Sequence, residues 1–386
     1  MNLLIIGTGM YVCGRGTSEY GTVLPSIYQF QKKHDLINSI TIIYNSKKSK
    51  NIFLKKQKQI EKMFNNKINT SFILNDLKLE SLLKNINIKL DCAIVAIPDS
   101  LHFKIIKQLL ILKINVLTVK PFVTKSKDAK ELIAINDKNK LFSCVEFHKR
   151  YDESNEFLYE QIKNNKIGNI LYCLVEYSQK KIIPEKIFLK WSNNTSIFQY
   201  LGVHYVDLIG FVTKFIPIRV MAIGQKKYLK SKKINTYDSI EVIIEWKSKN
   251  ETFTSIISTN WIDPNNTSAM SDQKIKFVGT NGRIELDQKN RGVTSVTDKK
   301  AIEDINLYFS KFYLDHNNNS YNFKGYGYES IKTYLYDIYN LKIQNTDINE
   351  LNKFRPTFKN CLNSVIVQTA VDQSLNNNNA WIKTNL

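Results

Sequence analysis

The sequence predicts an α/β protein with two domains. We expect a doubly wound parallel sheet at residues 1–148 and an α+β domain with a large, mostly antiparallel sheet at residues 149–386. A chain of 386 residues is too long for one ordinary hydrophobic core, which predicts the division. Short apolar runs alternate with amphipathic stretches in the first part, and longer alternating runs follow in the second, which predicts the two types of sheet.

The first domain should contain parallel strands joined by helices, because parallel neighbours need a long crossover that is usually helical. The predicted strands are Leu3–Gly7, Ser39–Tyr44, Cys92–Ile97, Asn115–Val119 and Phe142–Phe147. The predicted helices are Thr22–Gln31, Leu77–Lys84, Leu101–Leu112 and Ser126–Asn136.

The second domain should be built mainly from long strands with few helices between them. The predicted strands are Ile170–Gln179, Ile218–Lys226, Ser239–Lys247, Thr252–Asn260 and Lys274–Val278. The predicted helices are Ile197–Val212, Tyr328–Asn340 and Pro356–Leu375. Alternation of apolar and polar residues predicts that one face of this sheet packs on a core and the other is exposed or covered by a partner.

The composition excludes several classes of protein. A hydrophobic fraction of 43% with 11% aromatic residues excludes a disordered or fibrous chain. The net charge of +20 raises the question of nucleic acid, but only six of the 55 basic residues are arginine, the residue that phosphate and base recognition uses most. We therefore expect no nucleic-acid partner. The alternative, a basic nucleic-acid binder, would bind polyanions with a steep salt dependence.

The sequence also predicts where the protein resides. No stretch approaches the roughly 18 uninterrupted apolar residues of a membrane helix, so we expect no membrane partner. The residues from Met1 to Gly7 have no basic region or cleavage site, which argues against a signal peptide. Five scattered cysteines without a Cys-x-x-Cys pair fit a cytoplasmic protein and predict no metal site.

A glycine turn follows the first predicted strand. Glycines there permit a tight turn and let backbone N–H groups approach a pyrophosphate, although the third glycine of Gly-x-Gly-x-x-Gly is replaced by Val12. We expect a dinucleotide cofactor to contact the residues of this turn: Gly7, Thr8, Gly9, Met10 and Tyr11. The segment up to Gly21 predicts an expanded loop before the first long helix.

The end of the second predicted strand lies at the usual offset for the position that reads the cofactor ribose. An acidic residue there favours NAD, whereas this sequence has Asn45 followed by Ser46, Lys47 and Lys48. A neutral group followed by two cations tolerates or attracts a 2'-phosphate, so we expect NADP or NAD, with NADP favoured. The alternative is that Lys47 and Lys48 are ordinary loop lysines.

Four further segments occur in order along the chain. They are Ala96-Ile97-Pro98-Asp99-Ser100-Leu101-His102, Lys120-Pro121, Gly202-Val203-His204-Tyr205-Val206-Asp207 and Val278-Gly279-Thr280-Asn281-Gly282. With these segments the sequence resembles the glucose-fructose oxidoreductase, inositol dehydrogenase and MocA family over almost its whole length. The resemblance implies an N-terminal Rossmann domain for NAD(P) and a second domain for substrate binding and oligomerisation.

The resemblance also implies roles for particular residues. The positions that it places near the cofactor are Ala96, Ile97, Pro98, His102, Lys120 and Pro121. Lys120 becomes the leading catalytic candidate, because an ammonium partly desolvated beside a cationic nicotinamide has a lowered pKa that suits proton exchange with a hydroxyl. The alternative for Lys120 is a solvated lysine before a proline turn. His204 matches a family histidine near the reacting carbon, and packing or capping is its alternative.

Two positions depart from the family pattern. Tyr200 stands where many members have an aspartate, four residues before the histidine. Its hydroxyl is a candidate acid/base and substrate contact, and aromatic packing is an equally good account. Val119 replaces the glutamate that commonly precedes Lys-Pro.

His148 and Arg150 are expected to bind substrate, although a hinge between domains with surface charges explains them as well.

These features predict an NAD(P)-dependent dehydrogenase or reductase acting on CH–OH groups. It would transfer a hydride between nicotinamide and a hydroxyl-bearing carbon of a sugar, cyclitol or sugar nucleotide. The alternative is a catalytically inactive NAD(P)-binding sensor or scaffold of the same fold, for which Val119 and Tyr200 are the hints. The free face of the second sheet is expected to form a homo-oligomer, a dimer or tetramer.

Overall fold

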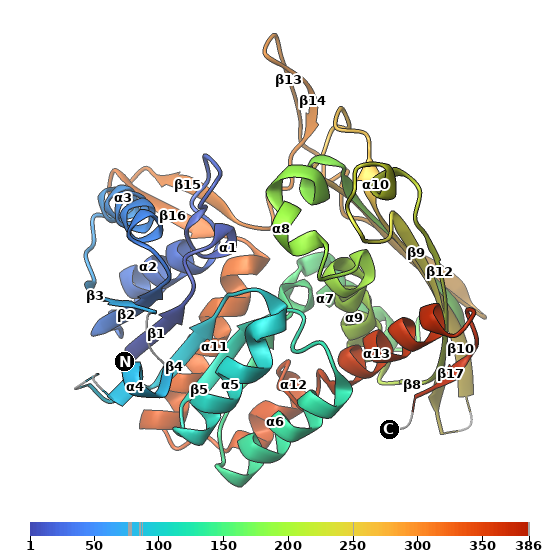
Figure 1. Cartoon of the computed structure of the whole chain (residues 1–386), viewed down its shortest axis with the longest axis horizontal. Helices are drawn as coiled ribbons and strands as arrows, with labels where there is room; N and C mark the ends of the chain where they lie inside the picture. Colours follow the sequence, from blue (N-terminus) through green and yellow to red (C-terminus); the bar gives the residue numbers. More distant parts are fainter. Residues whose placement is uncertain (76–78, 85, 87, 250, 385–386) are drawn as a thin grey trace. The chain divides into compact units, whose positions relative to one another are not determined.

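The computed structural model describes residues 1–75, 79–84, 86, 88–249 and 251–384, which form two compact units (Figure 1). The first unit comprises Met1–Val123, Lys127–Tyr151 and Tyr308–Cys361. The second comprises Thr124–Ser126, Asp152–Leu307 and Leu362–Leu386. The sequence-based division differs from this one, because it assigned residues 308–361 to the second domain.

The first unit contains the predicted parallel sheet, with six strands instead of the five expected, because β3 was not predicted. Its strands are β1 (Asn2–Ile6), β2 (Ser39–Tyr44), β3 (Asn69–Leu74), β4 (Cys92–Val95), β5 (Asn115–Val119) and β6 (Cys144–Glu146). Their order is β3-β2-β1-β4-β5-β6, and every neighbouring pair is parallel. This order defines a Rossmann sheet, whose ligands bind outside the carboxyl ends of the strands where the order reverses between β1 and β4.

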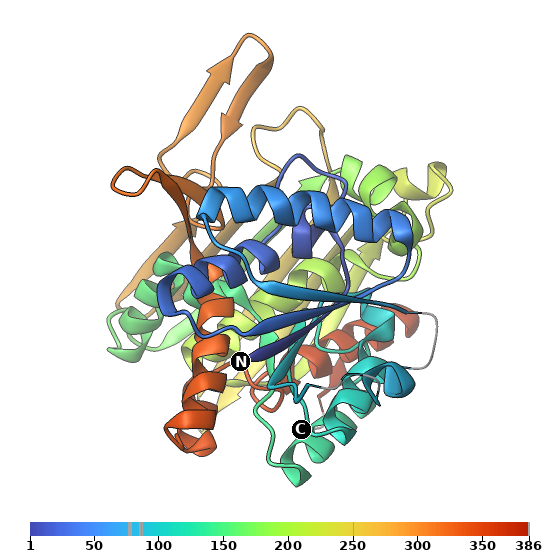
Figure 2. The same cartoon turned by 90° about the vertical axis from the view of Figure 1, so that its left-hand side faces the viewer.

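Helices cover both faces of this sheet, as a doubly wound topology requires. They are α1 (Met10–Cys13), α2 (Val23–His34), α3 (Lys47–Phe64), α4 (Leu79–Lys84), α5 (His102–Ile111) and α6 (Ser126–Lys138). Figures 1 and 2 show α2 and α3 side by side. The predicted helix Leu77–Lys84 is present from Leu79 onward, and Leu77 lies outside the described residues. The other helices predicted in this domain are present within a few residues of their expected ends.

Residues 308–361 join the first unit through apolar packing. They form a hairpin of β15 (Lys311–Asp315) and β16 (Ser320–Lys324), followed by α11 (Tyr326–Ile343) and α12 (Ile348–Phe354). Phe323, Tyr328 and Ile331 are buried in the same core as the strand residues of β1 and β2. This contribution explains why the segment does not belong to the second unit.

The second unit contains a seven-stranded mixed sheet. Its strands are β7 (Ile170–Lys180), β8 (Ile216–Gln225), β9 (Ser239–Ser248), β10 (Glu251–Asp263), β11 (Ser271–Gly279), β12 (Gly282–Asp287) and β17 (Ile382–Lys383). Their order is β12-β11-β7-β10-β9-β8-β17; β7 and β10 run parallel, and every other pair is antiparallel. The predicted large, mostly antiparallel sheet is therefore confirmed.

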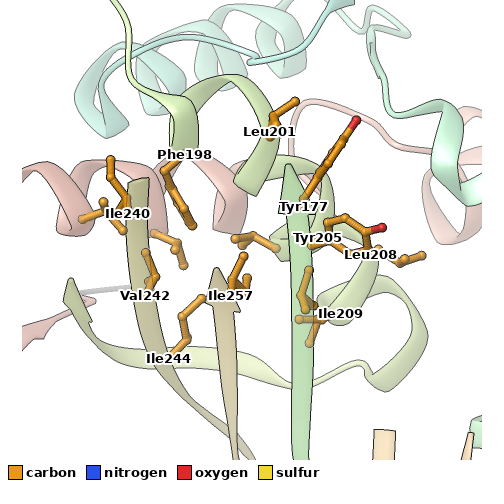
Figure 3. Close-up of a cluster of buried hydrophobic side chains, with 14 of the residues drawn as sticks. Tyr177, Phe198, Leu201, Tyr205, Leu208, Ile209, Ile240, Val242, Ile244 and Ile257 are labelled. Atoms are coloured by element: carbon orange, nitrogen blue, oxygen red, sulfur yellow. The ribbon is translucent and has the colours of Figure 1, made fainter. Parts of the chain in front are cut away.

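One face of this sheet packs against helices. These are α7 (Glu153–Lys163), α9 (Val203–Thr213) and α13 (Leu362–Asn376). Figure 3 shows Tyr205, Leu208 and Ile209 of α9 beside the strand that carries Tyr177, in the same buried cluster as Ile257. The helix predicted from Pro356 begins only at Leu362, because Pro356 and Thr357 pair with β6 instead.

The second unit also contains α8 (Leu189–Ser192), α10 (Tyr228–Ser231), two π-helical turns (Ile183–Ile187 and Phe198–Gly202) and a hairpin of β13 (Thr294–Thr297) and β14 (Lys300–Asp304). Figure 1 shows this hairpin projecting away from the sheet. In the part of the chain that the structure describes, no helix combines the length and apolar character needed to span a bilayer.

Candidate active site

The glycine turn after β1 has the backbone geometry that its sequence predicts. Gly7 has φ of 114°, and a Cβ atom there would lie 2.2 Å from the carbonyl oxygen of Ala96, so only glycine fits. Gly9 is the N-cap of α1, and a Cβ atom there would meet no atom within 4 Å. The space over Gly9 is therefore open, as a cradle for a phosphate group requires.

The expanded loop after this turn begins with a single helical turn. Val12, which replaces the third glycine, is fully buried in the core of the unit. Gly14 then ends α1 in the left-handed conformation. The ammonium of Lys56 on α3 donates to the carbonyl oxygens of Thr17, Ser18 and Glu19 at 3.2, 3.0 and 2.6 Å. Lys56 therefore holds the segment of the loop from Thr17 to Glu19 in place.

The end of β2 presents an exposed polar segment at the same edge of the sheet. Asn45 follows the strand, and its side-chain oxygen accepts a hydrogen bond of 3.1 Å from Asn75. Ser46 is the N-cap of α3 and forms a capping box with Ser49. Lys47 and Lys48 lie in the first turn of this 18-residue helix, not in a loop.

The end of β4 is tied to the end of β5 by a buried histidine. The Nδ1 atom of His102 lies 2.9 Å from the carbonyl oxygen of Pro121 and 3.1 Å from that of Phe122. Its Nε2 atom lies 3.0 Å from the carbonyl oxygen of Ile97. Both ring nitrogens are therefore engaged by the backbone, and His102 holds together the two segments that carry Ile97, Pro98, Lys120 and Pro121.

Lys120 follows β5 directly and begins a cis Lys120–Pro121 peptide bond. Burial lowers the pKa of its amine from 10.5 to about 7, against the opposing charges of Glu146 and Asp99, which raise it. Lys149 lowers this pKa further. A lysine in this state is divided between its two protonation forms at neutral pH and can accept or donate a proton.

Glu146 is a site residue that the sequence interpretation missed. It ends β6 and is only 3% exposed, and its Oε2 atom lies 3.0 Å from Nδ1 of His148. A nearby group, Tyr11 on α1, has its pKa raised well above the usual value by burial and then by the charge of Glu146. An acidic residue inside a predicted buried strand was the available signal, because carboxylates are seldom buried without a purpose.

His148 and Arg150 lie in the 3-10 helix η2 (His148–Tyr151), which follows β6. The ring of His148 stacks on Tyr326, with 5.6 Å between the ring centroids, and lies 5.1 Å from Phe309. Arg150 is 7% exposed. Neither residue is a freely solvated surface charge, and the segment lies directly before the boundary between the two units at Tyr151 and Asp152.

His204 lies on a well-packed helix of the second unit. It is the second residue of α9 and is buried, as is Asp207 one turn further along. The preceding glycine of the motif, Gly202, has no room for a side chain, because a Cβ atom would lie 2.3 Å from the ring of Phe198. The motif therefore combines a packing requirement with a polar side chain suited to chemistry.

Tyr200 lies in a π-helical turn, Phe198–Gly202, directly before α9. Its ring makes edge-to-face contacts with Phe188 and Trp191, with 5.3 and 5.4 Å between the ring centroids. The ring centroid of Trp261 lies 6.4 Å away. Burial raises the pKa of its hydroxyl to about 12, against a hydrogen bond with Gln179 that lowers it. The hydroxyl therefore stays protonated at neutral pH and can donate a hydrogen bond but cannot act as a base.

A buried ion pair supports the same unit. Asp152 caps α7 and accepts two hydrogen bonds from the guanidinium of Arg291, at 2.8 and 2.7 Å. Gln288 joins this network by donating to Asn155 at 3.1 Å and accepting from the hydroxyl of Tyr205 at 3.1 Å. Tyr205, the residue after His204 on α9, is thus hydrogen-bonded to the network that contains the Asp152–Arg291 ion pair.

Two family descriptions match this chain. The description "Oxidoreductase family, NAD-binding Rossmann fold" matches residues 1–147, and "GFO/IDH/MocA C-terminal domain" matches residues 156–285. Together they define a two-domain oxidoreductase with a nucleotide-binding first domain. The chain belongs to the GFO/IDH/MocA family, as the sequence motifs predicted.

Similar proteins agree with this assignment. The putative oxidoreductase YteT of Bacillus subtilis (strain 168) is 27% identical over 144 residues, which is 36% of this chain and 34% of that protein. The match therefore spans about a third of the relative's length.

Solved structures share the fold over the whole chain. A scyllo-inositol dehydrogenase from Lactobacillus casei with bound NAD(H) and scyllo-inositol has a TM-score of 0.69 at 14% identity, covering 100% of this chain and 99% of the other. A probable dehydrogenase from Thermotoga maritima has a TM-score of 0.66 at 16% identity, with the same coverage. At these identities the likeness shows the fold alone.

Proposed function

We propose that this protein is an NAD(P)-dependent dehydrogenase or reductase acting on a hydroxyl-bearing carbon of a sugar, cyclitol or sugar nucleotide. The observation that carries the proposal is the Lys120 amine, buried at the carboxyl edge of the Rossmann sheet with its pKa lowered to about 7. An amine of this kind is suited to exchange the proton of a reacting hydroxyl. The names of the structural neighbours, which include inositol dehydrogenases, favour a polyhydroxylated substrate.

The residues at the edge of the sheet fit a dinucleotide. The open space over Gly9 would accept the pyrophosphate, and we expect the backbone N–H groups of Thr8, Met10 and Tyr11 to bind it. Ala96, Ile97, Pro98 and Pro121 would lie along the rest of the cofactor, and His102 would hold their segments in place. A bound nicotinamide would supply the hydride acceptor or donor.

The first turn of α3 favours NADP over NAD. Lys47 and Lys48 lie at the helix end where the macrodipole is positive, an arrangement that costs about 0.3–1 kcal/mol for each cation. An anion bound at this end would offset that cost, and Asn45 and Ser46 offer no carboxylate to repel it. We expect Lys47→Ala combined with Lys48→Ala to weaken NADPH binding tenfold or more while leaving NADH binding within twofold, as measured by calorimetry.

In this proposal the protein groups handle the proton and orient the substrate. Lys120 accepts the hydroxyl proton during oxidation and returns it during reduction. His204 and Tyr200 contact the substrate through hydrogen bonds, and His148 and Arg150 bind its hydroxyl or anionic groups. The roles of His204 and Arg150 rest on the sequence resemblance and on the chemistry of each side chain.

Cofactor binding and turnover can be tested separately. Gly9 has φ of −79°, so Gly9→Ala should fold normally, but its methyl group would fill the proposed cradle and weaken NAD(P)H binding at least tenfold. The wild type should oxidise or reduce members of a panel of sugars, cyclitols and nucleotide sugars, followed through the absorbance of the reduced nicotinamide. Cofactor binding without turnover on every substrate would favour the sensor, and no binding at all would refute the proposal.

We also propose that the free face of the second sheet binds a second copy of the chain. Leu174, Ile256, Ile243 and Met221 are register partners across four neighbouring strands, so they form one apolar row on that face. Leu174 is 36% and Ile256 39% exposed. Ile256→Lys should dissociate the oligomer in sedimentation velocity, whereas Ile343→Lys, on an exposed part of α11, should not.

A further inference from the structure

We propose that Glu146, at the end of β6, is the electrostatic partner that keeps Lys120 partly protonated, in place of the carboxylate that Val119 does not provide. Glu146 acts through Lys120, so it is a positioning residue. This inference rests on the proposed function, because it explains how the acid/base group of that reaction is poised.

The strand register brings the carboxylate to the required position. In the parallel pair of β5 and β6, Val119 and Glu146 are direct partners, and Lys120 follows Val119. Side chains of direct partners in a parallel sheet lie on the same face, with the strands about 4.8 Å apart. A carboxylate on Glu146 therefore lies at the same level of the sheet as one on residue 119 would.

Burial makes this charge effective at a distance. Glu146 is 3% exposed, and its Oε1 atom is buried. Its Oε2 atom is held by Nδ1 of His148, whose ring is fixed by stacking on Tyr326. A carboxylate in such surroundings is poorly screened by water, so its field reaches neighbouring groups at greater strength than on the surface.

Three charged groups from separate elements act on the Lys120 amine. Glu146 from β6 has the largest favourable effect on its charged form, and Asp99, which follows β4, has the next. Lys149 from η2 opposes both. The same carboxylate also raises the pKa of Tyr11 on α1, where its effect is second only to burial. Glu146 thus affects two titratable groups on different elements, Lys120 after β5 and Tyr11 on α1.

The charge of Glu146 affects whether Lys120 can both accept and donate a proton. With Glu146 ionised, the Lys120 amine is divided between its protonated and neutral forms near pH 7. Without this charge, only Asp99 would oppose burial and Lys149, and Lys120 would be mainly neutral at that pH, able to accept a proton but less often to donate one. Glu146 would therefore preserve the reductive direction of the reaction at neutral pH.

The test measures the protonation of Lys120 directly in the cofactor-free protein. Lysine labelled with ¹³C at Cε gives a carbon signal that moves when the neighbouring Nζ loses its proton, and Lys120→Met identifies the signal of this residue. In the wild type its midpoint should lie near pH 7. In Glu146→Gln, which keeps the shape and removes the charge, the midpoint should fall by about one pH unit or more, because an opposite charge within several ångströms has an effect of this size.

Three variants make the result specific. Glu146→Asp keeps the charge and should retain a midpoint within about half a pH unit of the wild type. Glu131→Gln removes a surface carboxylate that pairs with Lys107, and should leave the midpoint unchanged. Glu146→Met provides a second neutral side chain should Glu146→Gln fail to fold, with the same expected fall.

The outcomes separate the two proposals. A wild-type midpoint near 7 that does not move in either neutral variant would overturn the role of Glu146 and leave the role of Lys120 intact. An equal fall in Glu146→Asp would also overturn it, because the charge would then not be the cause. A wild-type Lys120 that titrates only above pH 9 would instead refute the proposed acid/base function.

Discussion

Replacing Lys120 by methionine should make the first unit more stable at neutral pH. In the unfolded chain this amine has a pKa of 10.5, and burial in the folded protein lowers it to about 7. At roughly 1.4 kcal/mol for each pKa unit, this difference corresponds to roughly 5 kcal/mol of destabilisation below pH 7. The side chain retains some exposure, so we expect a gain of roughly 2 kcal/mol in Lys120→Met.

The pH dependence gives the sign of the effect. Because the folded pKa lies below the unfolded one, the penalty is complete below pH 7 and fades as the pH rises toward 10.5. The advantage of Lys120→Met over the wild type should therefore be largest at pH 6 and much smaller at pH 10.

The assay must report on the first unit. All four tryptophans, Trp191, Trp246, Trp261 and Trp381, belong to the second unit, so their fluorescence does not follow the first. Far-UV circular dichroism and calorimetry of the cofactor-free protein would measure it, with Lys104→Met, at an exposed lysine of α5, as the matched control. If Lys120→Met were no more stable than this control at pH 6, or if its advantage grew with pH, Lys120 would not be a desolvated amine.

Three further predictions concern other parts of the molecule. Asp152→Ala removes the carboxylate that pairs with the buried guanidinium of Arg291 and should cost about 3–5 kcal/mol by tryptophan fluorescence during urea unfolding, against less than about 1 kcal/mol for Glu245→Gln in an exposed ion pair. Tyr200→Phe should lower kcat less than about tenfold, because a hydroxyl with a pKa near 12 is not the base; a loss of a thousandfold would contradict this. Lys56→Met removes three hydrogen bonds to the loop at Thr17–Glu19 and should speed amide hydrogen exchange there about tenfold, and unchanged exchange would show that the loop is held otherwise.

The sequence predicted best those elements whose residues share one kind of environment, such as a buried strand formed by an apolar run. Strands β2 and β5 have the bounds that their apolar runs predicted, because all residues of β2 and the three central residues of β5 are buried. Strand β3 was missed because it lies at the edge of the sheet, where none of its residues is buried and its first three residues are polar. Helix α3 was missed because its buried stripe is narrow, with Phe53, Ile60 and Phe64 among many lysines.

The site could be predicted only where local motifs carry it. The glycine turn and Lys120–Pro121 are local sequence features, and the structure places both at the carboxyl edge of the first sheet. Glu146 belongs to no motif, because its importance comes from the register between β5 and β6, which a single sequence does not display. For the same reason the packing of residues 308–361 on the first unit could not be deduced from their order in the chain.

The arrangement of the carboxyl edge of the first sheet explains why a stable fold would tolerate Lys120, a buried amine that lowers the free energy of unfolding. The segments after β1, β2, β4, β5 and β6 meet there because all these strands are parallel, so distant parts of the sequence supply the glycine cradle, the lysine and the glutamate. A lysine buried beside them weakens the folded state, and a buried carboxylate repays only part of that cost. Such a conflict between stability and local chemistry is expected where function selects the residue, so the unfavourable burial of Lys120 is itself an argument that this edge is the active site.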